Sequence, residues 1–142
     1  MAPIAGLAVL LAPAQAKTDT AVLNLSISGA RNDKGVIRLV VCAANTGFPD
    51  CQKNAVRSAT LPVHAGKASF RFTEIPAGHY AIGAFHDANA NSKLDTFMGI
   101  PREGFGFSRN PPLKPRAPRF SEAKLFLSNG QEYEHIKLRH LL

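Results

Sequence analysis

The feature that most constrains this chain is the alternation of apolar and polar residues along several short segments. Leu23, Leu25 and Ile27 alternate with Asn24, Ser26 and Ser28. Neighbouring side chains of a strand point to opposite faces, whereas a helix repeats its apolar residues every three or four positions. On this pattern, strands are predicted within residues 23–28, 68–73, 80–84 and 123–127. Residues 36–42 are almost wholly apolar, which predicts a central strand buried on both faces, and further strands are predicted at 59–63 and 132–138. No segment offers ten residues of helical period.

About seven short strands separated by turn signals indicate an all-β fold, a Greek-key sandwich of immunoglobulin-like or transthyretin (prealbumin)-like type. The turn Pro76-Ala77-Gly78 precedes the strand that begins with Tyr80. Gly78 can adopt a positive φ, and Tyr80 is then expected to point into the core. This turn resembles the Pro-x-Gly-x-Tyr turn of transthyretin-like domains.

The 142 residues are enough for one domain. The chain has 17 Lys and Arg against 10 Asp and Glu, which gives a formal net charge of +7. The size argues against a multidomain enzyme, and no apolar run is long enough for a transmembrane helix. Residues 1–16 carry no charged side chain and end in Ala14-Gln15-Ala16, which suits a signal peptidase. The alternative is a buried first element of the domain. We expect a signal peptide at 1–16, a single domain at 17–142, and export to the periplasm or beyond.

Two cysteines, Cys42 and Cys51, flank a turn-rich loop. In an oxidising compartment such a pair predicts a disulfide, with two unreactive thiols as the alternative.

A polar loop follows the Tyr80 strand and has oxygen-bearing groups at alternate positions. Calcium favours six to eight oxygen ligands, so this spacing suggests a weak calcium site. The predicted ligands are Asp87, Asn89, Asn91, the carbonyl of Lys93, and Asp95. The loop departs from an EF-hand in having Ser92 and Met98 where glycine and glutamate are needed. The alternative is a loop held by Asx turns.

An enzymatic interpretation uses His86, Asp87 and Glu103 around a metal, as in a small metal-assisted hydrolase. Ser108 lacks the second glycine of a nucleophile elbow, and no other nucleophile has an evident base. Our first hypothesis is therefore that the protein is not an enzyme.

A candidate partner surface follows the polar loop, where two phenylalanines lie among glycines and charges. Its residues are Arg102, Glu103, Phe105, Phe107 and Arg109. The phenylalanines either form an exposed ligand surface or cover a sheet edge. The stiff basic segment that follows, 109–119, could meet lipid headgroups, an acidic polysaccharide or an acidic protein, or could simply be solvated. Nucleic acid is not expected.

The run from Gly78 to Tyr80, the loop from His86 to Asp95, and the segment Gly99-Ile100-Pro101-x-Glu103-Gly104-Phe105-Gly106-Phe107-Ser108 form one long motif. This motif resembles the bacterial domain-of-unknown-function family 2141. The resemblance covers most of the chain, from about Leu23 to Leu138. The resemblance implies an exported bacterial sandwich and no established activity. Many members have Asn-Gly where this chain has Asn91-Ser92, which weakens the calcium hypothesis. We expect an exported binding or accessory module of the envelope.

Overall fold

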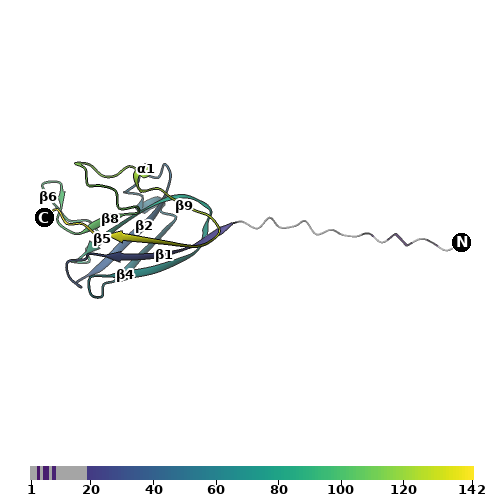
Figure 1. The fold of residues 1–142 in the computed structure, drawn as a ribbon, viewed down its shortest axis with the longest axis horizontal. Coiled ribbons are helices and arrows are strands. Elements are labelled where there is room, and N and C mark those ends of the chain that lie inside the picture. Colours follow the sequence, from purple (N-terminus) through teal and green to yellow (C-terminus); the bar gives the residue numbers. More distant parts are fainter. Residues whose placement is uncertain (1–2, 4, 7, 9–18) are drawn as a thin grey trace.

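The computed structural model describes residues 3, 5, 6, 8 and 19–142. The predicted signal peptide, residues 1–16, lies almost wholly outside the described residues. Residues 19–142 form two β-sheets packed face to face, with long loops gathered on the outer side of one of them (Figure 1). The predicted all-β sandwich is therefore confirmed.

The first sheet has three strands in the order β10-β1-β4. They are β1 (Thr20–Ser28), β4 (Ala68–Pro76) and β10 (Gly130–Lys137). β1 pairs parallel with β10 and antiparallel with β4. Since a parallel pair cannot be a hairpin, β10 returns from the far end of the chain to lie beside β1.

The second sheet has the order β3-β2-β5-β8, and β9 also pairs with β5. Its strands are β2 (Val36–Ala43), β3 (Arg57–Pro62), β5 (Gly78–Asp87), β8 (Phe105–Phe107) and β9 (Leu125–Leu127). All of these pairings are antiparallel. β8 and β9 share the same edge of β5, so β8 covers the part of that edge nearest the polar loop.

Three short strands and two short helices lie in connections where the alternation gave no signal. β6 (Thr96–Phe97) and β7 (Ile100–Pro101) form a small hairpin, and β8 follows it. The helices are η1 (Gln52–Asn54) and α1 (Phe120–Ala123). The strand predicted to begin at Ala123 begins at Leu125, because Ala123 ends α1 and is fully buried there.

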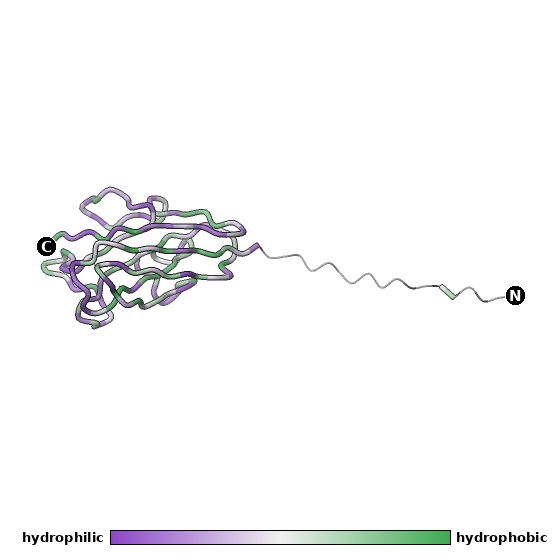
Figure 2. Tube along the Cα trace, turned by 60° about the horizontal axis from the view of Figure 1, so that its bottom comes forward, coloured by the Kyte–Doolittle hydropathy of each residue, from purple (hydrophilic) through white to green (hydrophobic). Residues whose placement is uncertain are grey.

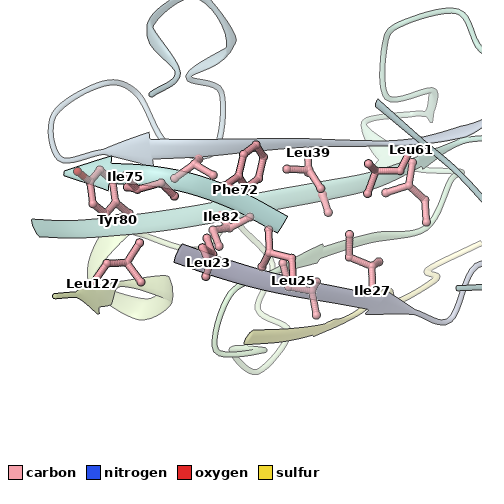
Figure 3. Close-up of a cluster of buried hydrophobic side chains, with 14 of the residues drawn as sticks. Leu23, Leu25, Ile27, Leu39, Leu61, Phe72, Ile75, Tyr80, Ile82 and Leu127 are labelled. Atoms are coloured by element: carbon pink, nitrogen blue, oxygen red, sulfur yellow. The ribbon is translucent and has the colours of Figure 1, made fainter. Parts of the chain in front are cut away.

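The core is the layer between the two sheets, filled by the inward side chains of each strand. Figure 3 shows Leu23, Leu25 and Ile27 of β1 in the same layer as Leu39 and Ile82 of the second sheet. Each of these five side chains is at most 2% exposed. Burial of this kind stabilises a fold by about 1.5–3 kcal/mol for each large side chain.

Tyr80 points into the core as predicted and is 7% exposed. Its hydroxyl donates a hydrogen bond to the carbonyl of Pro76 at 2.6 Å. Only Ala77 separates β4 from β5, so the chain crosses from one sheet to the other within this turn.

Cys42 and Cys51 form the predicted disulfide, and both residues are buried. The bond closes a loop that leaves β2 and returns to β3 through η1. The loop carries Phe48, whose ring meets the rings of Phe107 and Phe120 edge-on. The disulfide thus holds this loop against β8 and α1.

Candidate functional site

The carboxylate of Asp87 is the centre of the polar loop, and its side chain is fully buried. Arg38 on the neighbouring strand β2 donates from Nε to Asp87 Oδ2 at 2.6 Å. The backbone N–H groups of Asn91 and Ser92 donate to the same carboxylate at 3.1 and 2.8 Å. Asp87 therefore ties the loop to the strand pair β2–β5.

Burial alone would raise the pKa of Asp87, because a carboxylate is poorly solvated inside a protein. The hydrogen bond from Arg38 and the two backbone donors outweigh burial and hold the pKa of Asp87 below its ordinary value. Asp87 is consequently a charged structural anchor at neutral pH.

The other predicted calcium ligands bind one another. Asn89 and Asn91 donate from their side-chain amides to the two oxygens of Asp95, at 2.7 and 2.8 Å. The backbone N–H of Lys93 donates to Asn91 Oδ1 at 3.1 Å, which is an Asx turn. The geometry favours the Asx-turn alternative, because these oxygens already have donors.

The residues of the hydrolase alternative also have structural partners. His86 is 2% exposed, and its Nε2 lies 2.6 Å from the carbonyl oxygen of Lys34. Glu103 accepts the backbone N–H groups of Ala88 and Asp95, at 2.8 and 2.9 Å. Glu103 therefore closes the base of the polar loop, and each of its two oxygens already has a backbone donor.

The described residues contain no group of three or more His, Cys, Asp or Glu side chains that could hold a metal ion. Calcium binding at Asp87, Asn89, Asn91, Lys93 and Asp95 stays a prediction. Millimolar calcium is expected to leave the melting temperature equal to that in chelator, because binding would have to break the hydrogen bonds above. A melt in both conditions tests this. A rise that disappears in Asp95→Ala would establish the loop as a calcium site instead.

An apolar groove of about 730 Å³ lies over the outer face of the second sheet. Phe105 and Phe107 of β8 line it, and both side chains are half-buried. They share a face because they lie two positions apart on β8, which pairs with β5 in the register Phe105–Phe85 and Phe107–Gly83. Of the two alternatives predicted for the phenylalanines, β8 shows that they cover a sheet edge, and their side chains also line the groove.

The remaining lining of the groove comes from three loops, the β6–β7 hairpin, α1 and the C-terminal segment. It consists of Pro49, Leu94, residues 99–101, residues 111–118, Glu122 and Leu141. The C-terminal segment is held in place because Phe105 and Arg139 exchange two backbone hydrogen bonds, at 3.1 and 2.8 Å. Most of this lining is proline or aliphatic side chain, so the groove is apolar.

Two cations and one carboxylate line the side of the groove near α1. Lys114 and Arg116 donate to Glu122 at 3.1 and 2.6 Å. The hydrogen bond from Arg116, the backbone N–H of Arg119 and Lys114 together lower the pKa of Glu122 to about 2. Glu122 can neutralise only one of the two cations, so this side keeps a net positive charge.

The five residues of the predicted partner surface do not lie together in the structure. Arg102 is exposed and stacks over the ring of Phe97, 5.6 Å from its centroid. Arg109 lies at the other end of β8, where its backbone N–H donates to Glu134 at 2.8 Å. Phe105 and Phe107 line the groove, whereas Arg102, Glu103 and Arg109 do not.

Leu113, Ile100 and Leu141 also line the groove and were not among the predicted site residues. The cluster of four prolines between residues 111 and 118 was a usable signal, since a run rich in proline has a fixed shape and few hydrogen-bond donors. The contribution of Leu141 had no local signal, because it depends on where β10 ends.

Ser108 has a structural role beside the groove. It is fully buried; its hydroxyl accepts the backbone N–H of Ile82 and donates to the carbonyl of Ala123. This bond pair joins β5 to α1.

Comparison with known proteins identifies a family for this chain but does not indicate an activity. A sequence model of the family described as "Uncharacterized protein conserved in bacteria", the domain-of-unknown-function family 2141, matches residues 25–135. No curated protein and no solved structure matches. Within the described residues, no helix is long and apolar enough to cross a membrane.

Proposed function

Since the chain belongs to the domain-of-unknown-function family 2141 of bacterial proteins, we propose that it is an exported, non-enzymatic binding module of the cell envelope. Its ligand is an amphiphile, a molecule with an apolar body and an acidic head, and the site is the groove over the second sheet. The disulfide and the uncharged leader at residues 1–16 support export.

The apolar groove of about 730 Å³ is the observation that carries this proposal. Ligand sites are typically concave, mostly apolar and largely formed before binding, with a few polar groups that orient the ligand. Phe105 and Phe107 are fixed by β8, Pro49 by the disulfide loop, and Leu141 by the pairing of Arg139. The groove is therefore held open by several elements of the fold.

The charge beside the groove selects the acidic head. Lys114 and Arg116 share the single carboxylate of Glu122, so one positive charge remains for the ligand. In addition, the protein as a whole carries a formal net charge of +7. An anion is attracted to such a surface at long range, most strongly at low ionic strength.

A fluorescent amphiphile tests the proposal. The dye 1-anilinonaphthalene-8-sulfonate has an apolar aromatic body and one sulfonate, and we expect it to bind with one-to-one stoichiometry. Leu113→Asp places a carboxylate in the groove at a side chain that is 47% exposed, so folding should be retained. Its dye affinity is expected to fall about tenfold or more, as loss of half a leucine contact predicts.

The matched control is Phe126→Asp on β9. Phe126 is 61% exposed and does not line the groove, so this change should leave dye affinity within a factor of about two. The uncharged dye N-phenyl-1-naphthylamine should bind more weakly than the sulfonate at low salt. Equal dye affinity of Leu113→Asp and the unmodified protein would reject the groove as the site.

A further inference from the structure

Exposed apolar side chains gather at one end of the sandwich. The described residues include nine large hydrophobic side chains that are exposed, and six of them lie at this end. The six are Phe97, Met98, Ile100, Leu113, Leu141 and Leu142. Figure 1 places β6 beside the C-terminus, and Figure 2 colours the C-terminal end of the chain green, which marks hydrophobic residues. Ile100, Leu113 and Leu141 line the groove, whereas Phe97, Met98 and Leu142 do not. Exposed apolar side chains gathered in this way mark an interaction site.

The hairpin β6–β7 presents the most exposed of these residues. Phe97 pairs with Ile100, so Met98 and Gly99 form a two-residue turn, with φ of 52° and 81°. Positive φ at both positions favours Asn-Gly, and a methionine is unfavourable there. Met98 is nevertheless 87% exposed. Neither the turn nor the core of this protein accounts for a methionine at the tip.

Positive charge surrounds the tip. Arg102 stacks over Phe97, and Lys93 lies exposed on the loop that leads into β6. From Lys93 to Glu103 the sequence has two cations, Lys93 and Arg102, and two carboxylates. Those two, Asp95 and Glu103, each accept two hydrogen bonds within the loop. The oxygens of these carboxylates are therefore bound within the loop, whereas Lys93 and Arg102 are exposed to solvent.

We propose that this end docks on a bilayer that contains anionic phospholipid, with the tip residues Phe97 and Met98 entering the boundary between headgroups and acyl chains. Arg102 and Lys93 lie where the lipid phosphates would be, which combines apolar insertion with electrostatic attraction. A second copy of the chain fits this end less well, because two basic surfaces repel each other. The inference rests on the proposed envelope location, and it uses the tip and not the groove.

Vesicle co-sedimentation with the full chain tests the inference. We expect binding to mixed phosphatidylglycerol–phosphatidylcholine vesicles, and much weaker binding to phosphatidylcholine alone or in high salt. Met98→Asn gives the turn the residue that it favours, so its melting temperature should be equal or higher. Its vesicle affinity should nevertheless fall roughly tenfold, as loss of one inserted apolar side chain predicts.

Tyr133→Asn is the matched control, since Tyr133 is 76% exposed on β10 and lies outside the tip. It should bind vesicles as the unmodified protein does. Unchanged vesicle binding by Met98→Asn, or equal binding to both vesicle types, would overturn the inference. So would light scattering that shows a dimer which Met98→Asn dissociates. Dye binding without vesicles should be unchanged in Met98→Asn, so failure of the tip is distinguishable from failure of the groove.

Discussion

Replacing Arg38 by methionine is expected to lower the free energy of unfolding by about 3–5 kcal/mol at neutral pH. The substitution leaves the fully buried carboxylate of Asp87 with only the backbone donors of Asn91 and Ser92. An uncompensated buried charge costs far more than the attraction that an intact pair contributes, because the carboxylate cannot recover its hydration. Chemical denaturation at pH 7 measures the loss.

The pH dependence gives this prediction a second readout. In the unmodified protein the pKa of Asp87 is lowered, so its contribution to stability is complete above the unfolded value of about 3.9 and is lost as pH falls through the lower folded value. In Arg38→Met the carboxylate keeps its burial but loses the hydrogen bond and charge of Arg38, so we expect its pKa to rise above the unfolded value. The variant should therefore regain stability as pH falls from 7 toward 5, where the unmodified protein gains none from Asp87.

Arg71→Met on β4 is the control, because Arg71 is exposed and the change removes the same charge from the surface. It should alter stability by no more than about 0.5 kcal/mol. A loss in Arg38→Met as small as this, or a pH profile parallel to that of the unmodified protein, would mean that Asp87 is not the anchor of the loop.

Loss of the disulfide is expected to lower the free energy of unfolding by about 2–3 kcal/mol, through the greater freedom of the unfolded chain. The sulfur atoms join residues nine positions apart, which is a short loop, so the effect lies at the lower end of the usual range. Thermal melts with and without reductant measure it. The double variant Cys42→Ala/Cys51→Ala should melt lower than the oxidised protein and show no response to reductant.

Loss of the disulfide should also weaken dye binding. Phe48 meets Phe107 edge-on with ring centroids 5.7 Å apart, and Pro49 lines the groove. Without the crosslink this loop is less well held against β8, so the groove loses part of one wall. Full dye affinity in the double variant would show that the groove does not depend on the disulfide loop.

The Arg38–Asp87 ion pair and the disulfide both stabilise loops that border the groove. The Arg38–Asp87 pair holds the polar loop to β2 and β5, and the disulfide holds the loop of Phe48 to β8 and α1. The groove lies between these two anchored loops and the proline segment. In this protein the inner faces of the sheets form the core, while the outer face of one sheet supports the site.

The sequence by itself determined the local features of this protein. Apolar patterning predicted β1 to β5, β9 and β10, mostly by alternation and for β2 by a nearly continuous apolar run. Alternation is a local signal because successive side chains of a strand face opposite sides wherever the strand lies. The disulfide was predictable from the spacing of Cys42 and Cys51, since the two cysteines flank one loop. The Asx turn of the polar loop was also predictable as an alternative, because its hydrogen bond joins residues two positions apart.

Only the tertiary structure decided which segments meet. Arg38 and Asp87 are 49 positions apart, and nothing local to either residue indicates the other. The pairing of β1 with β10 sets where the C-terminal segment runs, and so brings Leu141 into a groove with Pro49 and Phe107. Such contacts depend on strand order and register, which are fixed by burying all inner faces at once. Alternation predicts whether a residue faces inward or outward, but it does not predict which strand pairs with the strand that carries the residue.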